Sequence, residues 1–191
     1  HKVQTTRFCI RGICNFHLTS KLKSQIIFVD TPGIFLPKRR LEKAMVSAAW
    51  SELSSTDKVV FIHDVLKKID NSTKEIIEKI LKIKKDVILV LNKIDLLPKE
   101  DLLIKISEIK NLYNFEETFL ISAKNGSGCD KLIEYLAKKM PSHSFFYDEN
   151  TISDLPQSIL ASEITREKLF KNLNKELPYN LTVETEKWLI N

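Results

Sequence analysis

Asn92, Lys93 and Asp95 stand in the tetrapeptide NKID, directly after the apolar run DVILVL. A carboxylate at Asp95 can accept hydrogen bonds from both the ring N–H and the exocyclic amine of guanine. Adenine has a lone pair at the first of these positions and would leave the carboxylate unpaired. Asn92 can brace neighbouring loops, and the stem of Lys93 can lie along a flat base. The motif predicts a guanine site; the alternative is an Asp95 that caps a helix ahead of Pro98.

Ser122, Ala123 and Lys124 follow the next apolar run, ETFLIS. We expect this tripeptide to supply a backbone N–H for the guanine carbonyl and a side-chain wall for the base. The tripeptide is short, and its weight comes from its order. It is the third of three polar motifs, after DTPG and NKID, and each motif comes directly after an apolar run.

Asp30, Thr31, Pro32 and Gly33 form the earliest of these motifs, DTPG, after the run QIIFVD. A carboxylate at the end of a strand can hold Mg²⁺, usually through a water molecule. A glycine beside it lets a backbone N–H approach a phosphate oxygen. The same four residues also suit an ordinary turn. Together with the other two motifs, they predict the phosphate and metal side of a nucleotide site.

Strand-length apolar runs alternate with longer stretches of helical periodicity, which is the pattern of an α/β sheet. The expected strands are Arg7–Cys14, Gln25–Asp30, Lys58–Asp64, Asp86–Asn92 and Thr118–Ile121. The expected helices are Leu41–Leu53, Asn71–Ile83, Lys99–Leu112 and Gly128–Lys139. Sheets of this class bind ligands at the carboxyl ends of their strands. We therefore predict a doubly wound fold of the P-loop NTPase kind, with all three motifs at one edge of its sheet.

The composition is that of a folded protein, with 43% hydrophobic and 29% charged residues among 191. Lys and Arg total 30 against 25 Asp and Glu, so the net charge of +5 permits a polyanionic partner. The three cysteines form no CxxC or Cys/His cluster, which favours reduced thiols. No apolar run approaches the ~18 to 20 residues needed to span a bilayer. We expect a cytoplasmic protein.

With these motifs in place, the sequence resembles the Era GTPases over almost its entire length. VQTTR at 3–7 resembles the family's first switch, in which a threonine ligates magnesium. That role falls to Thr6, with Thr5 as the alternative. DTPG resembles the second switch, with Asp30 on the metal side and Gly33 on the γ-phosphate side. The resemblance implies GTP, GDP and Mg²⁺ as ligands, with Thr6, Asp30 and Gly33 as the residues of hydrolysis.

The C-terminal part, ASEITREKLFKNLNKELPYNLTVETEKW, resembles the family's junction into an RNA-binding KH domain. We expect a GTP-binding domain over 1–141, a linker over 142–160 and the start of an α+β KH domain over 161–191. The last part should hold a helix at Ala161–Leu177 and a strand at Tyr179–Leu189. The resemblance implies binding to small-subunit ribosomal RNA and assistance to maturation of a 30S-type subunit, with GTP hydrolysis as a conformational switch. It also implies a monomer without a DNA partner, and it leaves open peripheral association with the inner face of the cell membrane.

The chain departs from the family pattern because its 191 residues contain no GxxxxGK[ST] phosphate-binding loop. In the family, that loop precedes VQTTR and follows a central strand of the sheet. We therefore expect an incomplete GTP-binding domain, a gap in its sheet and doubtful hydrolysis. Ile34 follows DTPG where Ras-like enzymes have glutamine, which implies slow turnover. Two alternatives remain: a catalytically dead RNA- or ribosome-binding remnant of a truncated reading frame, and a related ribosome-assembly or tRNA-modification GTPase.

Overall fold

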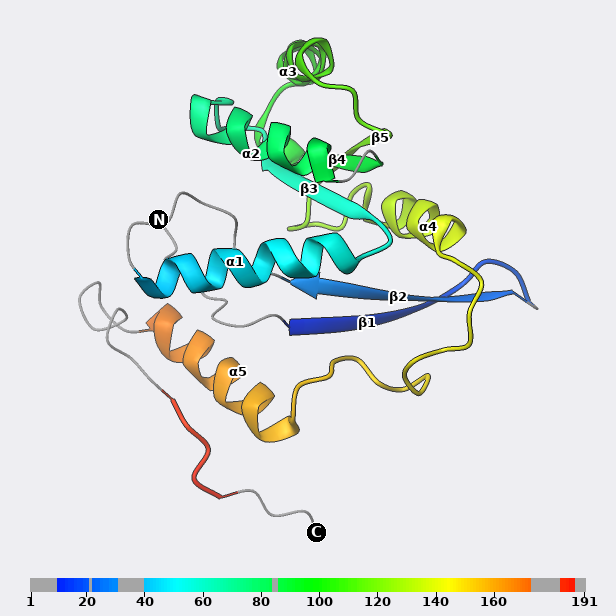
Figure 1. The fold of residues 1–191 in the computed structure, drawn as a ribbon, viewed down its shortest axis with the longest axis vertical. Coiled ribbons are helices and arrows are strands. Elements are labelled where there is room, and N and C mark those ends of the chain that lie inside the picture. Colours follow the sequence, from blue (N-terminus) through cyan, green and yellow to red (C-terminus); the bar gives the residue numbers. More distant parts are fainter. Residues whose placement is uncertain (1–9, 21, 31–39, 84–85, 173–182, 188–191) are drawn as a thin grey trace.

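The computed structural model describes residues 10–20, 22–30, 40–83, 86–172 and 183–187. Its strands form two sheets (Figure 1). β1 (Ile10–His17) and β2 (Lys23–Asp30) pair antiparallel, whereas β3 (Val59–Asp64), β4 (Val87–Asn92) and β5 (Glu117–Ile121) pair parallel in that order. Within the described residues, β2 and β3 are not paired with each other. The expectation of an α/β fold with a parallel sheet is therefore confirmed.

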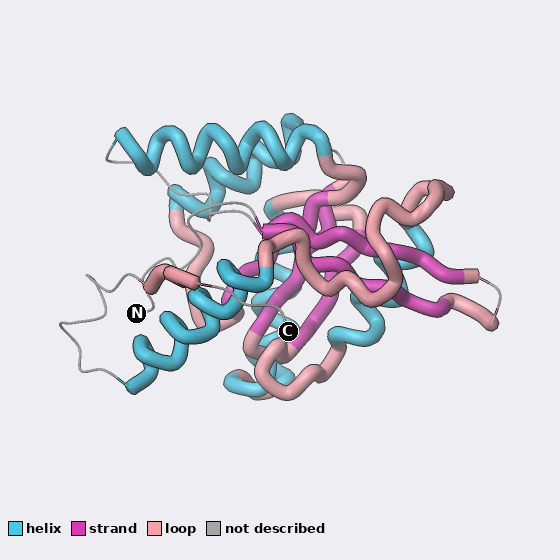
Figure 2. Tube along the Cα trace, turned by 90° about the horizontal axis from the view of Figure 1, so that it is seen from below, coloured by secondary structure: helices cyan, strands magenta, loops and turns pink. Residues whose placement is uncertain are grey.

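Helices surround the strands, which gather in the middle of the molecule (Figure 2). The helices are α1 (Arg40–Ser55), α2 (Asn71–Ile83), a 3₁₀ turn η1 (Ile94–Leu96), α3 (Lys99–Leu112), α4 (Cys129–Lys139) and α5 (Gln157–Asn172). α2 and α3 have the bounds predicted for them. No helix among the described residues is long and apolar enough to cross a bilayer.

β4 forms the centre of the core, because every residue from Val87 to Leu91 is buried. A strand that is apolar on both faces needs cover on both faces. On one face, Ile88 and Val90 pack with α4 and with Ile26 of β2. On the other face, Leu89 and its neighbours pack with α3. Packing on both faces holds β4 in place, and it therefore also fixes the position of the loop that follows Asn92.

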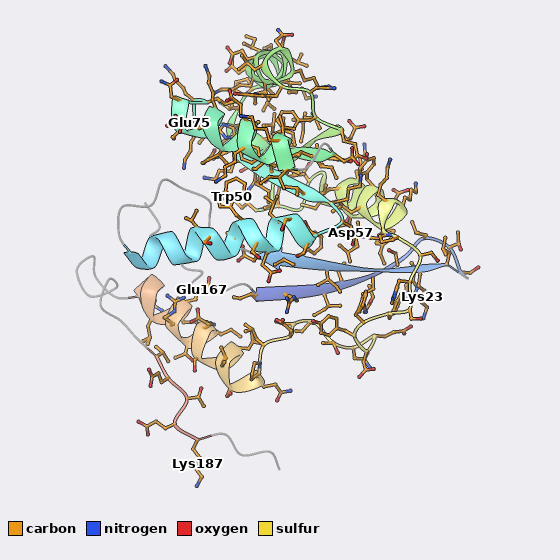
Figure 3. The ribbon with its side chains drawn as sticks, viewed as in Figure 1. Lys23, Trp50, Asp57, Glu75, Glu167 and Lys187 are labelled. Atoms are coloured by element: carbon orange, nitrogen blue, oxygen red, sulfur yellow. The ribbon has the colours of Figure 1, made fainter. Side chains whose placement is uncertain are left out.

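α1 and α2 enclose a third apolar cluster with the beginnings of β3 and β4. Trp50 on α1 faces α2 (Figure 3), and the Lys79 ammonium lies 4.2 Å from the centre of its ring. A cation over an indole face adds to the apolar packing. Trp50 is therefore a half-buried residue that packs against this cluster.

Some predicted bounds need correction, and pairing explains the first. β1 is described from Ile10 to His17, so it ends beyond the predicted Cys14, because it pairs with β2 as far as Lys23. α5 begins at Gln157, four residues before the predicted helix, directly after Pro156. Proline is favoured there because the start of a helix needs no N–H from it, and the Pro156 carbonyl accepts hydrogen bonds from the N–H groups of Ile159 and Leu160.

The predicted strand at 179–189 lies mostly outside the described residues, and its described part, 183–187, is not a strand. The Thr185 hydroxyl instead donates to the carbonyl of Ser158 on α5, at 2.7 Å. Residues 183–187 contact a helix and are not paired with a neighbouring strand among the described residues, so the alternating pattern alone gave a wrong prediction.

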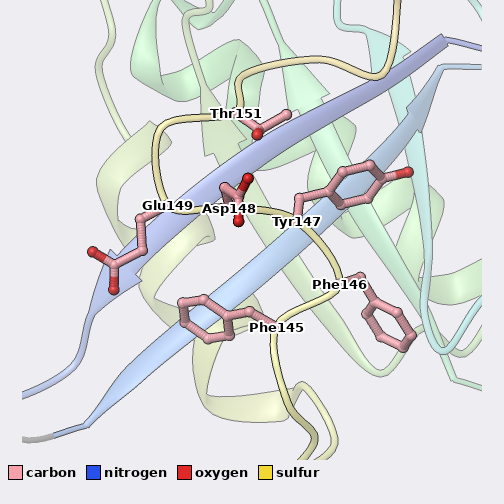
Figure 4. Close-up of a pocket in the computed structure, with 6 residues that line it drawn as sticks. All are labelled: Phe145, Phe146, Tyr147, Asp148, Glu149 and Thr151. Atoms are coloured by element: carbon pink, nitrogen blue, oxygen red, sulfur yellow. The ribbon is translucent and has the colours of Figure 1, made fainter.

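The segment between α4 and α5 crosses the β1–β2 sheet (Figure 4). It forms a bridge between Ser153 and Gly12, and the N–H of Ile13 donates to the carbonyl of Ile152 at 3.0 Å. Gln25 binds the same segment with both ends of its amide: Oε1 accepts from the N–H groups of Phe146 and Tyr147, and Nε2 donates to the carbonyl of Tyr147. These bonds fasten the segment to the sheet.

Candidate functional site

The NKID and SAK loops meet at the carboxyl ends of β4 and β5. Asn92 is the last residue of β4, and Ile121, the last residue of β5, lies opposite it in the parallel register. The Asn92 Oδ1 atom accepts hydrogen bonds from the N–H of Lys93 at 2.8 Å and from the N–H of Ala123 at 3.0 Å. One side-chain oxygen thus joins the two loops that the sequence assigned to one base.

Lys93 has a left-handed backbone, with φ 70° and ψ 34°. For a residue with a Cβ atom this conformation costs about 1 kcal/mol, so the neighbouring contacts must hold it. Its ammonium lies 2.6 Å from Oδ2 of Asp64, the last residue of β3. Sequence reasoning missed Asp64. The available signal was its place at the end of a strand, one strand away from NKID.

Asp64 is itself held in place. Its Oδ1 accepts from the N–H of Leu66 at 3.0 Å, and its backbone lies opposite Asn92 in the β3–β4 register. Partial burial opposes ionisation of Asp64, but the hydrogen bonds from Lys93 and Leu66 outweigh it, and the pKa of this carboxyl lies below its ordinary value. Asp64 is therefore an anion at neutral pH, facing the ammonium of Lys93.

The SAK loop places one hydroxyl in an unusual position. Ser122 is fully buried; its N–H donates to the carbonyl of Ser127, and its own carbonyl accepts from the N–H of Gly126. Within the described residues, its Oγ has no hydrogen-bond partner. A buried hydroxyl without a partner costs about 1 to 3 kcal/mol. Ala123, Lys124 and, on the neighbouring loop, Asp95 are exposed and available to a ligand.

Asp30 ends β2 and lines a groove of about 670 Å³ that runs along β3. Asn92, Lys93 and Asp64 line the same groove, so it connects the metal-side candidate with the base loops. His63 lies on its wall, and burial holds the pKa of this imidazole below its usual value. The other predicted phosphate-side residues, Thr6, Thr31, Pro32 and Gly33, lie outside the described residues.

A second cavity, of about 430 Å³, is formed by the segment between α4 and α5 itself (Figure 4). It is lined by Phe145, Phe146, Tyr147, Asp148, Glu149 and Thr151. None of the predicted residues lines it, and two of its six lining residues are acidic, which suits no anionic ligand. The site that the motifs define is the strand-end edge with its groove.

A parallel sheet with the NKID and SAK loops at its carboxyl edge is the arrangement of the P-loop NTPase-like class, and comparison with known proteins agrees. The family described as a 50S ribosome-binding GTPase matches residues 1–93. GTPase Era of Rhizobium meliloti is 47% identical over 188 residues, covering 98% of this chain and 58% of the relative. GTPase Era of Bradyrhizobium sp. (strain ORS 278) is also 47% identical, with 98% and 59% covered. The chain belongs to the Era GTPase family, and it spans a little over half the length of these curated relatives.

Solved structures show the same likeness. Era in complex with MgGDPNP and nucleotides 1506–1542 of 16S ribosomal RNA superimposes with a TM-score of 0.83 at 35% identity, covering 93% of this chain and 59% of that one. Aquifex aeolicus Era bound to GDP·AlF₄⁻ gives a TM-score of 0.81, also at 35% identity, with the same 93% and 59% covered. The elongation factor SelB of Methanococcus maripaludis, at 21% identity and a TM-score of 0.51, shares the fold alone.

Proposed function

We propose that this chain carries the guanine-recognition and switch-bearing part of an Era-type GTPase. The observation that supports the proposal best is the Asn92 oxygen, which binds the Lys93 and Ala123 amides together. This bond fixes the NKID and SAK loops against each other before any ligand arrives. A base site assembled in advance loses less entropy on binding than two independent loops would.

The residues present fit a guanine nucleotide. Asp95 offers an exposed carboxylate for the ring N–H and the exocyclic amine, and Ala123 and Lys124 line the same edge. The buried hydroxyl of Ser122, which has no partner among the described residues, is suited to a group that arrives with the ligand or with loop closure. Adenine in this place would leave Asp95 without a donor, and that penalty is the source of selectivity.

We assign the metal and phosphate side to the two switch segments. Asp30 offers carboxylate oxygens, which Mg²⁺ prefers, and Thr6 offers a hydroxyl. Magnesium, when bound, supplies neutralisation of charge on the phosphate oxygens. Gly33 lets its backbone N–H approach the γ-phosphate side, with Thr31 and Pro32 shaping the loop. Loss of that phosphate would release both segments, which is the switch we propose.

We assign residues 1–141 to the GTP-binding domain, 142–160 to the linker and 161–191 to the start of a KH-type domain. The groove is lined by the end of β2 and by β3, and we propose that it receives the central strand that carries the phosphate loop in the family. The relative bound to 16S ribosomal RNA supports small-subunit ribosomal RNA as the partner. We further propose action in small-subunit maturation, as a cytoplasmic monomer.

A second candidate is an RNA- or ribosome-binding remnant without catalysis. The two candidates differ in phosphate binding and agree on the base loops. Titration of the chain with a fluorescent GTP analogue in magnesium separates them. Micromolar affinity of this chain alone would refute the claim that the phosphate loop is needed. Millimolar affinity of this chain, rising to micromolar once the native upstream segment is added, would refute the remnant.

Base recognition is tested with a probe that does not depend on the phosphate loop. We expect millimolar GMP to shift the amide resonances of Lys93, Asp95 and Ala123, and AMP to leave them in place. Asp95→Asn should weaken the GMP response about 10- to 100-fold, because it removes an acceptor in charge-assisted hydrogen bonds. The same variant should gain a response to XMP, whose second carbonyl accepts from the new amide N–H.

The matched control is Asp101→Asn, at an aspartate on α3 that is also exposed and lies outside the NKID and SAK loops. It should leave both responses unchanged. Equal responses of the parent chain to GMP and AMP would refute the base assignment. If GMP binds elsewhere on the chain, GMP will shift the amide resonances but Asp95→Asn will not alter these shifts.

A further inference from the structure

We propose that Asp64 is a positioning residue for base recognition: it fixes the ammonium of Lys93 so that the lysine stem forms one wall of the base site. The proposal rests on the function proposed above and adds to it a residue from a third strand. The contacts of Asp64 with Lys93 and Leu66 are made within the chain itself, so we expect the pair to form with or without a nucleotide.

The geometry points in one direction. The Lys93 ammonium and Asp64 Oδ2 are 2.6 Å apart, and the Asp64 side chain is 18% exposed against 49% for Lys93. The anchor is therefore the more buried and more rigid partner, and the lysine is the partner whose freedom it removes. A free lysine side chain has many rotamers, and ordering it upon binding a base costs about 1.5 to 2 kcal/mol. An ion pair present beforehand reduces that cost.

The position of Asp64 follows from the parallel register. Its Cα pairs with that of Asn92, and the N–H of Val65 donates to the Asn92 carbonyl at 3.1 Å. Asn92 in turn holds the backbone of Lys93 through Oδ1. The lysine is thus held at both ends, by Asn92 at its amide and by Asp64 at its ammonium, and the left-handed backbone lies between these two anchors.

Asp64 is better placed for this role than the other anions of the groove. Glu52 pairs with Arg11 across the molecule, at 3.8 Å. Asp30 ends a strand of the other sheet. Lys67, two residues beyond Val65, uses its carbonyl to bind His63 and Lys105, so the loop after Asp64 is anchored independently of Lys93. Loss of the Asp64 carboxylate should therefore affect the NKID loop and leave β3 in place.

The test compares Asp64→Asn and Asp64→Glu with Asp86→Asn, a control at an exposed ion pair with Lys58 at the opposite end of the sheet. In the free chain, amide hydrogen exchange at Lys93, Leu96 and Ala123 should become about three- to tenfold faster in Asp64→Asn, as for loss of a partly exposed ion pair. Exchange at the β4 amides should not change. Asp64→Glu should recover part of the protection, and Asp86→Asn should match the parent chain.

The second measurement is the GMP response, which should weaken in Asp64→Asn by a similar factor and recover in Asp64→Glu. Exchange rates at the three amides within twofold of the parent, in a folded Asp64→Asn chain, would refute the positioning role. That result is independent of nucleotide binding. A parent chain whose resonances do not respond to GMP would refute the proposed function instead. If amide exchange were still faster in Asp64→Asn, Asp64 would remain the anchor of Lys93.

Discussion

At the scale of single residues, the site depends on polar atoms at strand ends whose partners are few and specific. The side chains of Asn92 and Asp64 bond to neighbouring loops, whereas Asp95 remains exposed and available to a ligand. Ser122 differs from all three because its buried hydroxyl has no described partner. Such a group lowers stability without a ligand, so its presence favours a role in binding.

The Ser122→Ala variant should separate binding from stability. Removing a buried hydroxyl that lacks a partner should leave the free energy of unfolding unchanged or raise it by up to about 1 kcal/mol. The GMP response should nevertheless weaken, because the methyl group cannot bond to the closed loop or the ligand. Chemical denaturation and the GMP titration measure the two effects on one sample.

Ser162→Ala is the matched control for this prediction. The Ser162 hydroxyl is also buried but bonds to the carbonyl of Ser158 at 3.0 Å. Its loss should lower the free energy of unfolding by about 1 kcal/mol and leave the GMP response unchanged. A Ser122→Ala chain that behaves like Ser162→Ala would show that Ser122 has only a structural role.

At the scale of elements, the start of α4 approaches β5 so closely that the residue directly before the helix, Gly128, must be glycine. Gly128 has φ 76°, and a Cβ atom there would lie 2.2 Å from the carbonyl oxygen of Leu120. Gly126, two residues earlier, has φ 82°, and nothing lies within 4 Å of its Cβ position. The SAK loop lies between β5 and α4, so this contact also sets the position of the base loop.

The two glycines form a matched pair for a stability test. Gly126→Ala should lower the free energy of unfolding by about 1 kcal/mol, the cost of a left-handed backbone for a residue with a Cβ atom. Gly128→Ala should lower it by about 2 to 4 kcal/mol, because overpacking adds to that cost. Thermal and urea unfolding measure the difference, and equal losses would show that the close approach to Leu120 is relieved without cost.

Sequence reasoning predicted these elements well where the local pattern was strong and poorly where pairing decided the outcome. α2 and α3 follow from periodicity and from the Pro98 that precedes α3, and their bounds were predicted correctly. The end of β1 depends on its pairing with β2, and the conformation of residues 183–187 depends on α5. No pattern within either segment reveals such partners. Asp64 was missed for the same reason, because its role exists only through the β3–β4 register.

At the scale of the whole molecule, α4 joins two sheets that do not pair with each other. Leu132, Leu136 and Ala137 pack in one cluster with Ile26 of β2 and with residues of β4 and β5. A cluster shared by both sheets couples their stability, although no backbone ladder connects them among the described strands. The segment between α4 and α5 adds hydrogen bonds to β1, but it does not reach the parallel sheet through any described bond.

Leu136→Ala tests this coupling, because Leu136 is 2% exposed at the centre of the shared cluster. The variant should lower the free energy of unfolding by about 2 to 5 kcal/mol. Amide exchange should become faster in β1 and β2 by a larger factor than in β4, because β4 keeps its packing on α3. Leu103→Ala, at a side chain on α3 that is 68% exposed, should change the free energy by no more than about 0.5 kcal/mol. An equal loss of protection in both sheets would mean that the parallel sheet depends on α4 as much as the β1–β2 sheet does. The β1–β2 sheet could not then be regarded as the less stable part of the fold.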